Sequence, residues 1–414
     1  MPGFVRFCVL AFALCLTACS TFTGVAADET FVRDAIRQVE RDFVPDKRLA
    51  VWDVSTSVDD GRIVVQGKSD SEQAIESLKR SLAQRQASVE VEITLLPEES
   101  AEVGNLSWAL VKVPVASLTG KPLFASPTTT QALLGTPLRV LEWQRPFWRV
   151  QMPDGYIGWV HSAQIKRLSQ AQLSDWNAAD HLVVTARTSE LKDSAGAILM
   201  PLTVGSRLKM LDRKRGQVQA QLPDGRIGWI VAADVMDARA HASHWQVMRS
   251  GSREAFWKAY IAQAERLLGT PYLWGGTSAS GVDCSGFVSL MWQMVGIVSM
   301  RDADQLIAHA NRLNLQSLDE IPVGGYLAFG RIDETGKPKV EHIGISLGKG
   351  DFIHSLGSVR IESVNPASEC FNAYERSRFL GAYAVDLNVI KASLLVPMQK
   401  NRFYRTPPQP LQLR

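Results

Sequence analysis

Cys284 is the residue of this chain whose type and setting best suit covalent chemistry. It follows Asp283 in GTPYLWGGTSASGVDCSGF (269–287), where a Gly- and Ser-rich loop gives way to the apolar run GFVSLMWQMVGIV. This change of composition predicts a buried helix that begins at the cysteine. Because a thiolate is the reactive form of cysteine, and a helix N-terminus lowers a thiol pKa, we expect Cys284 to be a nucleophile.

Two histidines further along the chain are spaced to serve such a thiol as base and orienting group. His342 lies in EHIGISLG and His354 in DFIHS, and both segments are predicted strands. If 348–350 is a three-residue hairpin loop, position 354 faces position 344 and the histidines become diagonal neighbours on one face. A two-residue loop would put them on opposite faces. The predicted arrangement is that of an activated cysteine nucleophile.

Zinc binding is the alternative use of one cysteine and two histidines. No C-x-x-C or H-E-x-x-H accompanies them, and a cysteine that leads a helix suits nucleophilic attack better. The remaining histidines lack such a setting and are interpreted as structural or solvated: His161, His181, His241, His244 and His309. We therefore expect neither a metal nor a cofactor.

Length and charge limit the classes of protein. A chain of 414 residues is too long to fold around a single hydrophobic core, which predicts roughly two to four domains. The net charge of +3 and the absence of a long basic run argue against a nucleic-acid-binding protein.

The first 18 residues are predicted to be an export signal. Arg6 precedes FCVLAFALCLTA, an apolar segment too short to span a bilayer. The sequence LTAC at 16–19 resembles the lipobox of bacterial lipoproteins, which implies cleavage before Cys19 and a lipid anchor on its sulfur. Ser20 resembles the signal that sorts lipoproteins to the outer membrane, facing the periplasm. A secretory signal with a chance cysteine is the alternative.

The cysteine count excludes a disulfide-rich protein. With Cys19 lipidated and the signal removed, only Cys284 and Cys370 of the five cysteines remain in the folded chain. A disulfide between the two is an alternative, but it would consume the thiol whose setting favours reaction.

Residues 30–97 are predicted to form a small α+β domain after a linker at 19–29. TFVRDAIRQVERDFV and SEQAIESLKRSLA have helical spacing, whereas WDVSTSV, RIVVQGK and SVEVEITLL alternate as strands. The order α-β-β-α-β resembles the BON domain of bacterial envelope proteins, and we assign it no catalytic role.

An internal repeat follows. MPDGYIGWV (152–160) corresponds to LPDGRIGWI (222–230) at a constant offset of 70 residues, and each copy is predicted to form a small β-barrel, at 108–170 and 178–240. The closing G-x-x-W pattern resembles the SH3-like domains of bacterial cell-wall enzymes; a generic β-repeat is the alternative. Tyr156 of the first copy is replaced by Arg226 in the second.

Residues 245–388 form the last predicted domain, and the tail at 389–414 is expected to be unstructured. GTPYLWGGTSASGVDCSGF, EHIGISLG and FIHS resemble the NlpC/p60 family of cell-wall cysteine peptidases. The resemblance implies a papain-like α+β fold, with Cys284 as nucleophile, His342 as base and His354 as orienting third residue. It also implies that Tyr272 assists the backbone N–H of Cys284 in an oxyanion hole.

Two SH3-like barrels before such a domain resemble a narrower group, the γ-D-glutamyl-diamino-acid endopeptidases of peptidoglycan stem peptides. They cleave between γ-D-Glu and the diamino acid of peptides with a free N-terminal L-Ala. The resemblance assigns recognition of the ammonium and carboxylate groups to Arg301, Asp302, Asp283 and Ser285, a cleft wall to Trp274, and closure against longer peptides to Tyr156.

Two observations leave this assignment open. Arg301 and Asp302 are alternatively a surface pair near a helix start. FASPTTTQALLG lacks the acidic residue that relatives often carry before the glutamine, which weakens the expected requirement for a free amine.

The sequence thus predicts a multidomain α+β envelope lipoprotein that hydrolyses stem peptides through a Cys-His-His thioester mechanism. A papain-like amidase or acyltransferase acting on another acyl substrate is the first alternative. A non-catalytic wall-binding scaffold is the second, disfavoured because Cys284, His342, His354 and Tyr272 are all present.

Overall fold

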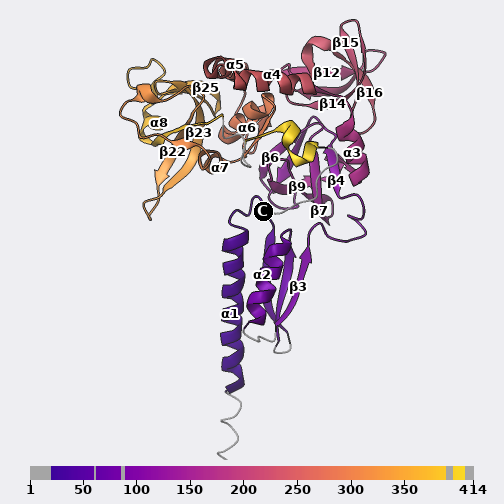
Figure 1. Ribbon diagram of the computed structural model, residues 1–414, viewed down its shortest axis with the longest axis vertical. Helices are drawn as coiled ribbons and strands as arrows, with labels where there is room; N and C mark the ends of the chain where they lie inside the picture. Colours follow the sequence, from indigo (N-terminus) through magenta and orange to yellow (C-terminus); the bar gives the residue numbers. More distant parts are fainter. Residues whose placement is uncertain (1–19, 60–61, 85–88, 388–394, 406–414) are drawn as a thin grey trace, which may run out of the picture. The chain divides into compact units, whose positions relative to one another are not determined.

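The protein is described by a computed structural model that covers residues 20–59, 62–84, 89–387 and 395–405 (Figure 1). It divides into two compact units, one up to Glu99 and one that begins at Ser100. The predicted export signal and Cys19 lie outside the described residues. Of the helices in the described ranges, none has the length and apolar character needed to cross a membrane.

The first unit confirms the α-β-β-α-β order. Its elements are α1 (Ser20–Phe43), β1 (Trp52–Asp59), β2 (Arg62–Ser69), α2 (Glu72–Ala83) and β3 (Val89–Leu95). Strand β2 pairs antiparallel with β1 and parallel with β3. Both helices bury apolar side chains against one face of this sheet, so that Val32 of α1 and Leu78 of α2 share a core with Val65 of β2.

Helix α1 corrects one predicted boundary. It begins at Ser20, so residues expected to be a linker at 19–29 are helical from the second residue onward. A helix whose later turns are fixed by burial of Val32, Ile36 and Val39 extends at little further cost, because adding a residue is far easier than nucleation.

The second unit contains the two predicted repeats as SH3-like antiparallel sheets. The first repeat comprises β4 (Trp108–Val111), β5 (Val115–Thr119), β6 (Thr128–Leu133), β7 (Pro137–Gln144), β8 (Phe147–Gln151), β9 (Ile157–His161), η1 (Ser162–Gln164) and β10 (Ile165–Leu168). After α3 (Gln170–Ala178), the second repeat comprises β11 (His181–Val184), β12 (Thr188–Lys192), β13 (Ile198–Thr203), β14 (Arg207–Lys214), β15 (Gln217–Gln221), β16 (Ile227–Val231), η2 (Ala232–Asp234) and β17 (Val235–Asp237).

The two repeats have one topology. The strand order β10-β4-β7-β8-β9-β5-β6 of the first corresponds strand by strand to β17-β11-β14-β15-β16-β12-β13 of the second. Even an irregularity is shared, since the register shifts after Val140 in β7 and after Met210 in β14, again 70 residues apart.

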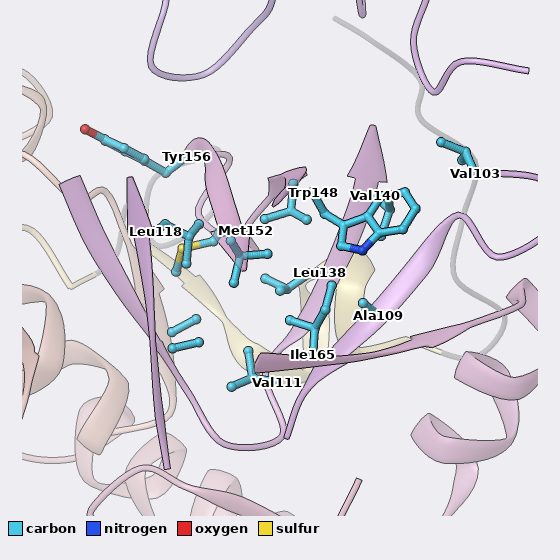
Figure 2. Packing of buried hydrophobic residues seen from close by; sticks show 14 residues of the cluster. Val103, Ala109, Val111, Leu118, Leu138, Val140, Trp148, Met152, Tyr156 and Ile165 are labelled. Atoms are coloured by element: carbon cyan, nitrogen blue, oxygen red, sulfur yellow. The ribbon is translucent and has the colours of Figure 1, made fainter. Parts of the chain in front are cut away.

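The core of the first repeat is apolar and closely packed around Leu118, Leu138, Val140 and Trp148. Figure 2 shows Tyr156 at the edge of this cluster, with its hydroxyl pointing away from the other labelled side chains. The tyrosine therefore anchors in the repeat while presenting a polar group outside it.

The C-terminal domain follows, with its sheet and helices as expected for an α+β domain. Its helices are α4 (Ala238–Ser250), α5 (Arg253–Glu265), α6 (Cys284–Met294), α7 (Ala303–Ile307) and α8 (Ala373–Ser377). The six-stranded sheet has the order β21 (Asn311–Arg312), β26 (Phe379–Ala384), β22 (Tyr326–Ile332), β23 (Pro338–Gly348), β24 (Asp351–Leu356) and β25 (Ser358–Ser363). A small hairpin, β18 (Thr277–Ser278) and β19 (Gly281–Val282), precedes α6, and η3 (Leu318–Glu320) precedes β22.

Helix α6 is buried because it packs between aromatic side chains and the sheet. Nine of its residues are buried, and it contacts β23 and β24 directly. Trp292 packs against Trp257 and Tyr260 of α5 and donates its indole N–H to the Tyr326 hydroxyl of β22 at 2.7 Å. These contacts fix the helix that begins at Cys284.

The prediction of an unstructured tail from 389 is wrong for residues 395–405. Strand β27 (Leu395–Pro397) pairs with β20 (Ile297–Ser299), and η4 (Met398–Lys400) and η5 (Arg402–Tyr404) follow. Phe403 is buried against Trp108, and the Asn401 side chain donates to the Pro153 carbonyl at 2.8 Å. Burial of these apolar side chains offsets the ordering entropy, whereas TPPQPLQLR from 406 lies outside the described residues.

Candidate active site

Cys284 is the first residue of α6, as the sequence predicted. Asp283 caps the helix by accepting the Gly286 N–H at 2.6 Å, which leaves the thiol at the start of the first turn. The side chain is 9 % exposed, and its sulfur accepts hydrogen bonds from the backbone N–H groups of Ile343 and Ser285. Because Ile343 directly follows His342, the thiol lies beside the strand that carries the predicted base.

His342 and His354 lie together on one face, although the predicted loop differs. Ile345 pairs with Ile353, as expected if position 344 faces 354, but the turn is the two-residue Lys349-Gly350, with both residues at positive φ. A register shift between Ser346 and Gly348 absorbs the extra residue, Leu347, and restores the diagonal relation. The Nε2 atom of His342 lies 2.6 Å from Nδ1 of His354.

The histidine contact limits which nitrogen can serve the thiol. Since Nε2 of His342 is engaged by His354, Nδ1 is the nitrogen left for proton exchange with Cys284. The geometry therefore places a thiol beside the strand of one imidazole, and that imidazole is held by a second one.

The pKa of Cys284 is raised, not lowered as the sequence analysis expected. Burial, with a further contribution from Asp283, raises the pKa of Cys284 to about 11. Burial and the cations Arg378 and Arg360 lower the pKa of His342 to about 4. At neutral pH the site thus holds a thiol and a neutral imidazole.

Arg301 is a buried centre of the site rather than the surface residue of the alternative interpretation. It is 2 % exposed and holds both oxygens of Asp283, at 2.6 and 3.1 Å, and the Ser285 hydroxyl at 2.9 Å. Asp302 lies 3.9 Å from the same guanidinium and begins α7 in a capping box with Gln305. The Asp283–Arg301 pair therefore braces the helix start on which Cys284 sits.

Tyr272 and Trp274 occupy the loop before α6. Burial, followed by Cys284 and Asp283, raises the pKa of Tyr272, so its hydroxyl remains a hydrogen-bond donor close to the thiol. Trp274 is 67 % exposed, as a residue on the rim of a cleft would be.

The first repeat adds polar groups that the sequence did not reveal. Arg301 donates from Nε to the Thr130 hydroxyl at 3.0 Å, and Thr277 donates its backbone N–H to Gln131 Oε1 at the same distance. Burial lowers the pKa of Arg301, but Asp283 and, more weakly, Asp302 and Tyr156 raise it above its ordinary value, which puts Tyr156 near the guanidinium. Strand β6 is thereby joined to the domain that carries Cys284, and a cavity of about 60 Å³ between them is lined by Thr130 and Arg301.

Glu362 and Asn372 are a second set of residues that the sequence analysis missed. Glu362 Oε2 lies 3.2 Å from Nε2 of His354, and the Asn372 amide donates to the same oxygen at 2.7 Å. Alternation around the turn at Gly357 would have placed Glu362 on the face of His354, which is the signal that could have found it.

The structure also bears on the disulfide and metal alternatives. Cys284 and Cys370 are both free cysteines, which excludes the disulfide alternative. Within the part of the chain that the structure describes, no group of three or more His, Cys, Asp and Glu side chains is arranged to hold a metal ion.

Comparison with protein families places the site in a known class. The NlpC/P60 family model matches residues 269–382, which include Cys284, both histidines and Tyr272. This chain is an NlpC/P60 family protein. The bacterial dipeptidyl-peptidase SH3 domain matches residues 118–165 of the first repeat. The protein is accordingly an NlpC/P60 cysteine peptidase, and the cell-wall substrates of that family imply an extracytoplasmic place in the cell envelope.

Two curated relatives and one solved structure are similar over more than half of this chain. A γ-D-glutamyl-L-lysine dipeptidyl-peptidase of Bacillus cereus is 25 % identical over 252 residues, 58 % of this chain and 71 % of that protein. A dipeptidyl-peptidase 6 of Lysinibacillus sphaericus is 24 % identical, covering 65 % and 94 %. The crystal structure of an NlpC/P60 family protein from Bacillus cereus has a TM-score of 0.56 at 22 % identity, covering 67 % and 98 %, and shows the shared fold.

Proposed function

We propose that this NlpC/P60 peptidoglycan peptidase cleaves between γ-D-Glu and the diamino acid of stem peptides such as L-Ala-γ-D-Glu-diaminopimelate with a free N-terminus. The observation that carries the proposal is the joining of the first repeat to the Cys284 domain through Thr130 and Gln131. A site bounded by a second domain suits a short peptide. The name of the Bacillus cereus relative, a γ-D-glutamyl-L-lysine dipeptidyl-peptidase, supports the same bond.

The mechanism is acyl transfer through a thioester. The sulfur of Cys284 attacks the γ-glutamyl carbonyl carbon as its proton passes to Nδ1 of His342, and the carbonyl oxygen becomes an oxyanion. The backbone N–H of Cys284 and the Tyr272 hydroxyl donate to that oxygen. Collapse breaks the C–N bond, and His342 gives the proton to the leaving amine. Water then attacks the thioester, losing a proton to His342, and the thiol of Cys284 is restored as the acid leaves.

Recognition of the peptide ends is assigned to charged groups near Arg301. Asp302 is the carboxylate for the N-terminal ammonium, and Tyr156 of the first repeat closes the site beyond it. The Ser285 hydroxyl is engaged by Arg301 and Asp283, so the α-carboxylate of D-Glu is met by this braced group rather than by a free serine. Trp274, on the rim, walls the cleft.

The proposal also includes the folds of the N- and C-terminal domains, the domain limits and the membrane anchor. We infer a papain-like fold for the C-terminal domain, a BON-like fold for residues 30–97, and domain limits near those predicted, with α4 spanning the limit at 240–245. We also infer acylation of Cys19 and outer-membrane attachment. Loss of membrane association in Cys19→Ser, with the signal still removed, is the expected result; unchanged association contradicts the anchor.

The test of function follows the purified protein with L-Ala-γ-D-Glu-diaminopimelate by mass spectrometry. An N-acetylated copy and a lysine-containing copy run alongside, and Cys284→Ala is the inactive control. Release of L-Ala-D-Glu from the free peptides only is expected. Cleavage of the acetylated peptide as well discards the amine requirement, as the missing acid before Gln131 would allow. No cleavage by a folded protein favours an amidase or acyltransferase acting on another substrate.

The gate assigned to Tyr156 has its own matched pair of variants. Tyr156→Ala should let the acetylated peptide react, with a change in the ratio of the two kcat/KM values of about tenfold, the range of one lost polar contact. Arg226→Ala, at the same position of the second repeat, should leave the ratio unchanged. An unchanged ratio in Tyr156→Ala removes the tyrosine from selection of the N-terminus.

A further inference from the structure

We propose that Glu362 is a positioning residue that fixes the proton of His354 on Nε2 and so presents His342 to Cys284 with an unprotonated Nδ1. This rests on the proposed function in one respect, that Cys284 is the nucleophile. Nothing in the sequence motifs of the site includes Glu362, which lies on β25, the edge strand beyond both histidines.

The strand register brings Glu362 behind His354. His354 pairs with Arg360, and Phe352 with Glu362, so His354 and Glu362 are diagonal neighbours on one face of β24 and β25. The His354 side chain is fully buried, and its Nε2 lies 3.2 Å from Glu362 Oε2. Nε2 makes no well-directed hydrogen bond to any described residue, so this carboxylate is its partner at ion-pair distance. Such contacts often tighten only when the reacting complex forms.

The carboxylate is itself held in place from both sides. Arg360 donates from Nε to Oε1 at 2.9 Å, and Asn372 donates from Nδ2 to Oε2 at 2.7 Å. The orientation of the Asn372 amide is determined by its other end, because Oδ1 accepts the N–H groups of Tyr374 and Glu375 at the start of α8. Only the NH₂ group can then face Glu362, and Glu362 can act only as an acceptor.

The carboxylate of Glu362 selects one tautomer of His354. A neutral imidazole has one N–H, and burial, His342 and Arg360 lower the pKa of His354 to about 2, so it is neutral. With the proton on Nε2, facing Glu362, Nδ1 of His354 accepts the Nε2–H of His342, and Nδ1 of His342 keeps its lone pair for the thiol. The opposite tautomer would put a proton on Nδ1 of His342, and no base would face Cys284.

The surrounding charges add a second reason for an acid here. His342 feels the cations Arg378 and Arg360 and the anion Asp283, while Glu375, Arg378 and Arg360 surround the carboxylate side. The two arginines oppose formation of an imidazolium during attack. A carboxylate next to His354 offsets them and stabilises the positive charge once the proton has left the sulfur.

Glu362→Gln is the test variant, and Glu375→Gln is its matched control. Glu375 is buried next to the same arginines, and no contact between it and either histidine is recorded in the described part of the chain. Histidine side-chain ¹⁵N spectra of the wild type should show the proton of His354 on Nε2, and Glu362→Gln should lose this tautomer or mix it. Its kcat should fall about 10- to 100-fold with KM unchanged, the range of a group acting through another. Glu375→Gln should change neither.

Alkylation separates this proposal from the proposed function. The rate of iodoacetamide reaction at Cys284, distinguished by mass mapping from the exposed Cys370, requires no peptide and should fall with kcat in Glu362→Gln. If the wild type cleaves no peptide but its spectra and alkylation behave as expected, the substrate is wrong and the positioning role stands. A wild-type His354 protonated on Nδ1, or a Glu362→Gln variant that keeps the Nε2–H tautomer and the wild-type alkylation rate, overturns it.

Discussion

The first and second repeats share one fold and differ in what they offer their neighbours. Strand order, the 70-residue offset and the register shift in the long strand are the same in both. The side chains at matched positions are not: Thr130, Gln131 and Tyr156 of the first repeat correspond to Met200, Pro201 and Arg226 of the second. The side chains of the first repeat contact the domain of Cys284. The two repeats therefore differ in their side chains and not in their fold.

The turn Pro-Asp-Gly shows the difference at its clearest. In both repeats the aspartate accepts a hydrogen bond from the backbone N–H two residues later: Asp154 accepts from Tyr156, and Asp224 accepts from Arg226. Tyr156 is 7 % exposed and near Arg301, whereas Arg226 is solvent-exposed and pairs with Asp224 at 2.8 Å. The turn of the first repeat lies near the buried Arg301–Asp283 ion pair, whereas the turn of the second repeat lies on the surface.

The largest effect is expected from Arg301→Ala, which removes the Thr130 contact between the first repeat and the Cys284 domain and leaves the Gln131 contact in place. Asp283 would be left buried without its cation, a loss of about 3–5 kcal/mol in stability. Urea denaturation followed by tryptophan fluorescence measures it. Arg187 of the second repeat donates to Thr270 at 2.9 Å and pairs with no carboxylate among the described residues. Arg187→Ala should cost about 1 kcal/mol, and equal losses would show that the two repeats are joined alike.

Gly135→Ala is expected to cost more than Gly205→Ala, although both glycines have positive φ, 78° and 86°. A Cβ at Gly135 would lie 2.3 Å from the Arg207 carbonyl oxygen, a backbone atom, whereas at Gly205 it would meet the movable Leu133 side chain at 2.9 Å. We expect about 2–4 kcal/mol against about 1–2 kcal/mol in thermal or urea unfolding. A reversed order would contradict the packing of the first repeat against Arg207.

Gln131→Ala should cost about 1–3 kcal/mol, because the buried Thr277 N–H would lose its acceptor. Pro201, the matched residue of the second repeat, is exposed, and Pro201→Ala should change stability by less than about 1 kcal/mol. Both are measured by the same unfolding assay. If the two substitutions have the same effect, the contact of β6 with Thr277 does not stabilise the domain.

Sequence periodicity was enough for the elements and for the reacting pair. The change from loop to apolar run located the start of α6 at Cys284, and the period of two in strands put His342 and His354 on one face. That second prediction held for a reason the sequence did not supply. The turn has two residues, and an unforeseen bulge at Leu347 compensates.

What escaped prediction depends on contacts distant in sequence. The raised pKa of Cys284 results from burial by the packed domain, which outweighs the local helix start. Thr130 and Arg301 are 171 residues apart, and no local pattern pairs them. The tail from Leu395 to Arg405 lacked a periodic signal long enough to predict, yet its buried Phe403 holds it against Trp108.

The smallest effect, and the one with opposite signs in the two repeats, is the response to pH of the paired turn aspartates. Burial raises the pKa of Asp154 to about 6, against the lowering effects of the Tyr156 N–H and Arg301. The folded state therefore holds this proton more tightly than the unfolded chain, and stability falls as pH rises from about 4 to 6. In Asp224 burial is outweighed by hydrogen bonds from Arg226, which lower the pKa, so stability is lost as pH falls.

At pH 7 Asp154→Asn should stabilise by about 1 kcal/mol, and Asp224→Asn should destabilise by less than about 1 kcal/mol. Unfolding midpoints between pH 4 and 7 measure both, and a stabilising Asp224→Asn or a pH-independent difference for Asp154→Asn would mean that the two turns share one environment.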